Sequence, residues 1–182
     1  MPQTAHRPLK VLVVDDEPDV RELLSEYFTE IGYDVTTAPD GAQAVEDITA
    51  NPTKYGLVIS DLQMPGVDGL GVLKAAKAAN PSLAVIIVTG YASVDSAVRA
   101  VRMGAYDYLT KPFTLGQIEV IVRRAAERLA LEAENRQLAR RVEGRDPVES
   151  EGAVLERLEA IDQRLARIER LLSGLPVGTR TI

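Results

Sequence analysis

Short apolar runs alternate along this chain with longer stretches in which apolar residues recur at helical spacing. The runs are rich in branched side chains and predict five strands, at 10–14, 33–37, 57–60, 84–88 and 106–109. The amphipathic stretches predict helices at 18–31, 41–50, 70–79 and 94–103, followed by a longer helix from Leu115. Strand and helix therefore alternate five times.

The alternation predicts an α/β fold with a doubly wound parallel sheet over about residues 10–125. Runs such as VLVV and VIIV are apolar throughout, which suits parallel strands covered by helices on both faces. Pro18 suits the first turn of a helix, and Thr114 with Gln117 forms a candidate capping box before the long helix.

Polar side chains follow four of the five predicted strands. Asp15 and Asp16 follow the first, Asp61 the third and Thr89 the fourth, and Lys111 lies two residues past the fifth. Because ligands of doubly wound sheets bind at the carboxyl ends of the strands, we expect these side chains to share one edge.

This set of side chains predicts a site for a hard divalent cation. Three carboxylates at one edge repel one another unless a cation compensates them. Mg2+ takes oxygen ligands, whereas zinc or copper would favour histidine or cysteine. One carboxylate could then attack phosphorus, with Lys111 neutralising the developing charge and the Thr89 hydroxyl donating to the phosphoryl oxygens.

A simpler interpretation exists for each aspartate, since this residue is favoured in loops and as a helix cap. For Asp15, Asp16 and Asp61 together, the convergence at strand ends favours a functional site. Asp19, Asp40 and Asp68 have no such neighbours, and capping or surface roles are expected for them.

Four segments resemble the hallmark segments of response-regulator receiver domains, the CheY-like domains of two-component systems. They are VLVVDDEPDV, ISDLQMPGVDGL, VIIVTGY and AYDYLTKPF, in the expected order. The resemblance covers about residues 9–125 and implies a (βα)5 fold with strand order 2-1-3-4-5.

The resemblance also implies a role for each site residue. Asp61 would be the phosphoacceptor, Asp16 a direct Mg2+ ligand, and Asp15 a ligand mainly through water. The main-chain carbonyl of Gln63 would complete the protein ligands of the metal.

Lys111 would contact the phosphoryl group, Thr89 would reorient towards it, and Tyr108 would follow as an aromatic switch. The alternative for Tyr108 is an ordinary strand aromatic. The Lys111–Pro112 bond is expected to be cis. Such a protein would not be an enzyme beyond its own phosphorylation and dephosphorylation.

The helix from Leu115 has no evident stop before Gly144, so its last part, 126–143, predicts an extension beyond the receiver. It resembles the signalling helix of NtrC-like regulators. A breaker at 144–147 precedes a second coiled-coil-like helix at 148–173, and flexible tails are expected at 1–8 and 174–182. Heptad spacing predicts a homodimer through these helices; its members are Leu131, Asn135, Leu138 and Val142, then Val154, Leu158, Ile161, Leu165, Ile168 and Leu172.

Composition narrows the function further. The chain has 182 residues, a formal net charge of -6, no cysteine and one histidine, His6, in the expected tail. A thiolate site is therefore excluded, and no long segment offers the basic face of a nucleic-acid reader, so DNA binding is not expected. Neither a secretory leader nor a spanning helix is recognisable, and a cytoplasmic protein is expected.

The preferred function is a DNA-free switch that accepts a phosphoryl group from a histidine kinase or histidine phosphotransfer protein. Phosphorylation would alter the face formed by the fourth helix, fifth strand and fifth helix, and so change dimerisation or docking. The alternatives are a DNA-binding transcriptional regulator, using arginines of the long helix on phosphates, and a phosphorelay intermediate.

Overall fold

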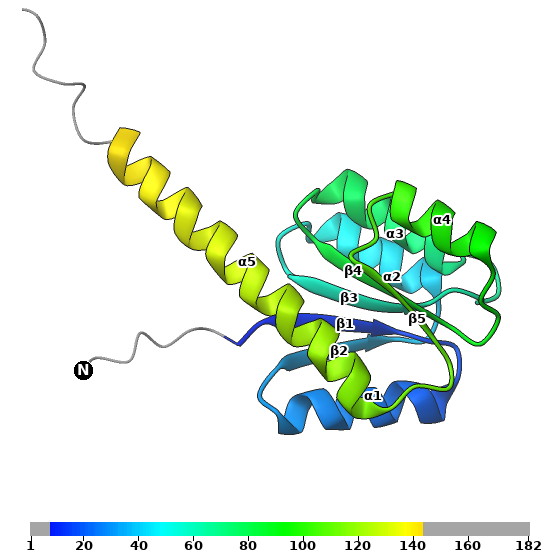
Figure 1. Cartoon of the computed structure of the whole chain (residues 1–182). Coiled ribbons are helices and arrows are strands. Elements are labelled where there is room, and N and C mark those ends of the chain that lie inside the picture. Colours follow the sequence, from blue (N-terminus) through cyan, green and yellow to red (C-terminus); the bar gives the residue numbers. More distant parts are fainter. Residues whose placement is uncertain (1–7, 144–182) are drawn as a thin grey trace, which may run out of the picture. The chain divides into compact units, whose positions relative to one another are not determined.

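The computed structural model describes residues 8–143, with side chains placed for 8–140. Five strands and five helices alternate strictly along this part of the chain (Figure 1). In chain order they are β1 (Lys10–Val14), α1 (Pro18–Glu30), β2 (Asp34–Ala38), α2 (Gly41–Ala50), β3 (Leu57–Asp61), α3 (Gly69–Ala79), β4 (Ala84–Thr89), α4 (Val94–Arg102), β5 (Asp107–Thr110) and α5 (Leu115–Glu143).

The strands form one parallel sheet in the order β2-β1-β3-β4-β5, which confirms the predicted doubly wound fold. The central strands β1, β3 and β4 are buried almost throughout, as expected when helices cover both faces of a sheet. The predicted element boundaries agree with the structure to within one residue. Asp61 and Thr89 are the last residues of β3 and β4, because both still pair with the neighbouring strand.

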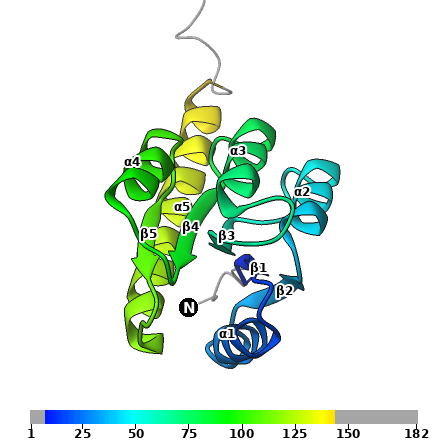
Figure 2. The same ribbon diagram turned by 90° about the vertical axis from the view of Figure 1, so that its right-hand side faces the viewer.

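Two hydrophobic cores lie on opposite faces of the sheet. One packs α2, α3 and α4 against the strands, through residues such as Ile48, Leu73 and Ala100. The other packs α1 and α5 against the strands, through residues such as Phe28 and Ile118. Figure 2 shows α2, α3 and α4 on one side of the sheet and α1 on the other.

Side-chain caps fix where several helices begin. Asp40 and Asp68 cap α2 and α3 by accepting from the main-chain N–H groups of Gln43 and Gly71, which confirms the capping role expected for both. The predicted capping box at Thr114 and Gln117 is also present before α5. A further capping box joins Ser93 and Ser96 at the start of α4.

Helix α5 is 29 residues long, which confirms a continuous helix from Leu115 to the predicted breaker. The chain divides into two compact units, the first ending at Ala133 and the second beginning at Glu134. The predicted breaker at 144–147, second helix at 148–173 and tail at 174–182 lie outside the described residues, as do residues 1–7 of the tail predicted at 1–8. None of the helices in the described part is long and apolar enough to cross a membrane.

Candidate functional site

The carboxyl ends of four strands bring the predicted site residues to one edge of the sheet. Asp15 follows β1, Asp61 ends β3, Thr89 ends β4, and Lys111 follows β5. The strands are in register there, since Asp61 pairs with Val88. The main-chain N–H of Lys111 donates to the carbonyl of Thr89 at 2.7 Å, so the end of β5 is joined to the end of β4.

The Lys111 ammonium lies at the centre of this edge. Its Nζ is 2.9 Å from Oδ1 of Asp61 and 3.0 Å from Oδ2 of Asp15. Both carboxylate side chains are buried, with 7% and 3% of their surface exposed. A third carboxylate, that of Glu17, lies 3.1 Å from the same nitrogen but is mostly exposed. The single ammonium of Lys111 therefore pairs with three carboxylates, two of which are buried.

Burial and ion pairing act in opposite directions on these groups. Burial raises the pKa of Asp15, and this effect exceeds the opposing effects of the Glu17 main-chain N–H and the Lys111 ammonium. Burial alone would lower the pKa of Lys111, but the bonds to Asp61, Asp15 and Glu17 outweigh it and raise that pKa above its ordinary value. The buried Asp15 anion is thus incompletely compensated by the single lysine.

The second oxygen of Asp61 is held by the main chain. The N–H of Gln63 donates to Oδ2 at 2.5 Å, so each carboxylate oxygen of Asp61 accepts from a different donor. Helix α3 begins close behind this strand end. A Cβ on Gly69 would overlap the carbonyl oxygen of Asp61 and would lie 2.9 Å from the Cα of Leu62. Glycine is therefore required where α3 meets the end of β3.

Thr89 and Tyr108 are placed by neighbours outside the carboxylate group. The Thr89 side chain is fully buried, and its hydroxyl accepts from the main-chain N–H of Tyr91 at 3.1 Å. The hydroxyl of Tyr108 shares a hydrogen bond of 2.8 Å with Oγ of Ser96, which belongs to the capping box of α4. Tyr108 therefore links β5 directly to the first turn of α4.

A family model for the response regulator receiver domain matches residues 11–123. The chain belongs to this family. The five-stranded CheY-like fold agrees, and the Asp61, Lys111 and Asp15 group lies inside the matched region.

Curated relatives of this receiver are regulators of the NtrX, NtrC and DctD kinds. It is 34% identical over 159 residues to "C4-dicarboxylate transport transcriptional regulatory protein DctD" of Rhizobium meliloti (strain 1021), covering 86% of this chain and 34% of the relative. It is 33% identical over 172 residues to "Nitrogen assimilation regulatory protein NtrX" of Azorhizobium caulinodans, covering 93% and 37%. The chain thus spans about a third of the length of the curated relatives it matches.

Solved structures similar to this receiver include both a separate domain and part of a longer protein. A response regulator receiver domain protein from Clostridium thermocellum has a TM-score of 0.64 at 32% identity, covering 68% of this chain and 98% of that one. NtrX from Brucella abortus has a TM-score of 0.65 at 34% identity, covering 72% of this chain and 30% of that one.

Receiver domains generally use Mg2+ for phosphorylation, and the donor atoms of this receiver fit such a cation. They are all oxygen: the buried carboxylates of Asp15 and Asp61, the exposed carboxylate of Asp16 and the main chain of Gln63. Within residues 8–143, no three acidic or histidine side chains form a group that could hold a metal ion alone. Mg2+ typically keeps several waters among its ligands and takes only one or two carboxylates.

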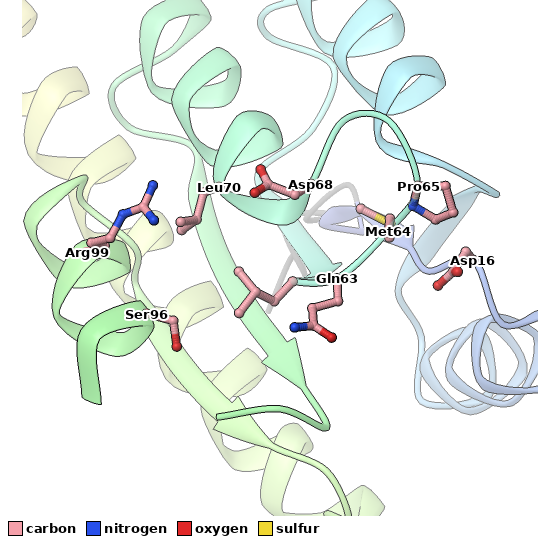
Figure 3. A pocket seen from close by; sticks show the side chains of 9 residues that line it. Asp16, Gln63, Met64, Pro65, Asp68, Leu70, Ser96 and Arg99 are labelled. Atoms are coloured by element: carbon pink, nitrogen blue, oxygen red, sulfur yellow. The ribbon is translucent and has the colours of Figure 1, made fainter. Parts of the chain in front are cut away.

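Asp16 and Gln63 line an open cleft of about 570 Å³ between the β3–α3 loop and α4 (Figure 3). Met64 and Pro65 form the loop side of the cleft, and Ser96 and Arg99 form the α4 side. Asp16 thus reaches solvent beside the buried Asp15, which gives a small donor or a hydrated cation access to this edge.

Sequence reasoning did not find two further residues of the site. Glu17 shares Lys111 with the two aspartates, and the guanidinium of Arg21 donates to the carbonyl of Asp15 at 2.7 Å. Glu17 directly follows the acidic pair, and Arg21 comes one helical turn after Glu17. This spacing would have placed both near the β1–α1 loop.

Proposed function

We propose that Asp61 accepts a phosphoryl group from a histidine kinase or a histidine phosphotransfer protein, and that this switches the receiver between two states. The observation that carries the proposal is the pairing of the buried Asp61 carboxylate with Lys111 at 2.9 Å, at the sheet edge where Asp15 and Asp16 also lie. Family membership supports the same assignment.

In the proposed step, one oxygen of Asp61 forms a bond to phosphorus as the bond from phosphorus to the donor nitrogen breaks. The leaving imidazole keeps the electron pair of that bond. Lys111, already beside Oδ1, neutralises charge on the transferred group, while the Gln63 N–H holds the other carboxylate oxygen. Mg2+, held by Asp15, Asp16, Asp61 and the Gln63 carbonyl, would supply charge neutralisation to the phosphoryl oxygens.

Thr89 and Tyr108 are proposed to carry the change away from Asp61. The Thr89 hydroxyl lies at the end of the strand beside β3 and could turn to donate to a phosphoryl oxygen. Tyr108 lies on β5, three residues before Lys111, whose main-chain N–H donates to the carbonyl of Thr89. Its bond to Ser96 gives any movement of β5 a direct effect on α4.

The proposed output surface is the α4–β5–α5 face. Val94, Val98 and Val101 lie at spacings of four and three along α4 and are 80%, 43% and 64% exposed. An apolar stripe of this kind on a helix is typical of a surface that another molecule covers. Phosphorylation would act through this face and the helical extension on dimerisation or partner docking, without DNA contact by the receiver and without enzymatic action on other molecules.

The test is acetyl phosphate treatment with Mg2+, read by intact-protein mass spectrometry. Wild type should gain one phosphoryl group, Asp61→Asn should gain none, and Asp40→Asn should behave as wild type because Asp40 caps α2 and does not line the cleft beside Asp16. Chelation of Mg2+ should stop the reaction. Equal modification of wild type and Asp61→Asn would contradict the assignment.

A second candidate, a DNA-binding transcriptional regulator, is favoured by the relatives. One of them, 39% identical over 115 residues, is named "DNA-binding transcriptional regulator NtrC" of Escherichia coli (strain K12). Binding of this chain to duplex DNA that weakens steeply with salt would support that function, because phosphate contacts release counterions. If this chain binds duplex DNA no more tightly than a control protein of similar net charge does, the DNA-free switch is favoured.

A further inference from the structure

A second cleft lies at the opposite edge of the sheet, where the strands begin. It has a volume of about 330 Å³ and is formed by the end of α3, the α3–β4 loop, the α4–β5 loop and α5 within the first compact unit. Its lining residues include Lys77 of α3, Ser82, Tyr106 and Arg128 of α5. In contrast to the acidic edge at Asp61, two cations face this cleft.

The Lys77 ammonium is half-buried and is satisfied only in part. It donates to the carbonyls of Leu83 at 2.7 Å and Pro81 at 3.3 Å. The third N–H of the ammonium can therefore donate to a ligand. Among the described residues no carboxylate lies at ion-pair distance from Lys77. Burial lowers the pKa of Lys77, and the nearby charge of Arg128 lowers it further, whereas the carboxylate of Glu132 on α5 acts in the opposite direction.

Arg128 approaches the same cleft from α5. Its guanidinium lies over the ring of Tyr106, with its Cζ 5.9 Å from the ring centroid, and its Nε donates to Glu132 at 2.7 Å. The other walls are apolar and come from Ala84, Ala105, Ala125 and Leu129. The cleft therefore combines positive charge with a flat aromatic surface and small apolar side chains.

We propose that this cleft binds a small organic anion, with its phosphate, phosphonate or carboxylate group between Lys77 and Arg128 and a flat apolar body against Tyr106 and the alanines. The volume suits a small ligand rather than a large cofactor. Charge-assisted hydrogen bonds from the two cations would supply the affinity. The cleft shares no residue with the Asp61 edge, so binding there does not require phosphorylation at Asp61.

The test uses phenylphosphonate, which carries the anionic group on an aromatic ring and transfers no phosphoryl group. It is titrated into the full chain without Mg2+ at constant ionic strength, and amide chemical shifts are followed by NMR. Saturable shifts are expected at Lys77, Gly104, Ala105, Tyr106 and Arg128. Arg128→Gln and Lys77→Gln should each weaken the Kd about tenfold or more.

Lys74→Gln and Arg124→Gln are the matched controls, since they remove an exposed cation from the same two helices without touching the cleft. Both should leave the Kd unchanged. If Lys77→Gln fails to fold, Arg128→Gln decides, because its side chain is 65% exposed. The proposal is overturned by absence of saturable shifts, by shifts confined to the Asp61 edge, or by equal weakening in the controls.

Discussion

At the residue scale, the group around Lys111 has more negative charge than its one ammonium can balance. Asp15 is the most enclosed of the three carboxylates, and its raised pKa means that folding disfavours its ionised form. At neutral pH, where Asp15 is ionised, the free energy of unfolding is therefore lower than it would be with a neutral side chain at this position. A bound cation would reverse this cost, since it would stabilise the ionised form.

Asp15→Asn is therefore expected to stabilise the metal-free protein by about 1 kcal/mol at pH 7, because a buried charge becomes neutral and can still accept from the Glu17 N–H. The same variant should lose most of the stabilisation that Mg2+ gives to wild type. Urea unfolding with and without Mg2+ measures both effects. A less stable metal-free variant would show that Lys111 compensates Asp15 more fully than we infer.

A second residue-scale prediction concerns Asp47, far from the site. The Lys54 ammonium, at 2.8 Å, and the hydroxyl of Tyr55 hold the pKa of Asp47 below its usual range. A carboxyl whose folded pKa is lowered contributes stability above its unfolded pKa, near 3.8, and loses that contribution as the pH falls through the folded value.

Asp47→Asn should therefore cost about 1 kcal/mol at pH 7, since the side chain is partly screened by solvent, and progressively less below pH 3.8. Urea unfolding of both proteins at pH 7 and at several pH values from 3.8 downwards measures the difference. A cost that stays constant as the pH falls would mean that the charge of Asp47 is not responsible.

At the element scale, the start of α4 depends on a hydrogen-bond group that includes a residue of β5. Ser96 accepts from and donates to Ser93 in the capping box, and it also bonds to the Tyr108 hydroxyl. The first turn of α4 and the middle of β5 are thus held by one serine side chain. Movement of Tyr108 would weaken the cap of α4 at the same time.

A double-mutant cycle tests this link. Ser96→Ala should cost about 1 kcal/mol through loss of the cap, and Tyr108→Phe should cost about 0.5–1 kcal/mol in wild type. In the Ser96→Ala background Tyr108→Phe should cost almost nothing, because its partner is already gone. Ser93→Ala serves as the control, since it removes capping but not the partner of Tyr108. Additive costs of Ser96→Ala and Tyr108→Phe would contradict the link.

The elements and the acidic edge could be predicted from the sequence because both follow from chain-local patterns. Parallel strands end at the same edge, so Asp15, Asp61 and Lys111 had to meet once the strands were recognised. The Ser96–Tyr108 bond, the role of Arg21 and the cleft at Lys77 were not predicted. They depend on how side chains from separate elements are oriented after packing, which periodicity does not encode.

At the scale of the whole molecule, the receiver has its proposed site at one edge of the sheet and its proposed output on one lateral face. The exposed α4 stripe is an apolar part of that face that is costly to leave in water. The heptad pattern of 126–143 predicts a second assembly surface, and dimerisation through it stays a prediction. A substitution in the α4 stripe therefore tests assembly without altering the proposed site of phosphorylation.

Val98→Asp should leave phosphorylation by acetyl phosphate intact and weaken any phosphorylation-dependent assembly about tenfold or more, because it places a charge in the apolar stripe. Size-exclusion chromatography with light scattering, before and after beryllofluoride with Mg2+, measures the mass. Leu23→Asp is the control, since Leu23 is 52% exposed but lies on α1. Equal effects of Val98→Asp and Leu23→Asp would exclude a specific role for α4.

The close approach of α3 to the end of β3 also limits which sequences this architecture accepts. The space behind the carbonyl of Asp61 admits a hydrogen atom at position 69 and nothing larger. Position 116, at the start of α5, has open space around it and a glycine that nothing nearby requires. In a saturation library, position 69 should therefore tolerate no replacement, whereas position 116 should accept many. The two glycines thus differ widely in substitution tolerance.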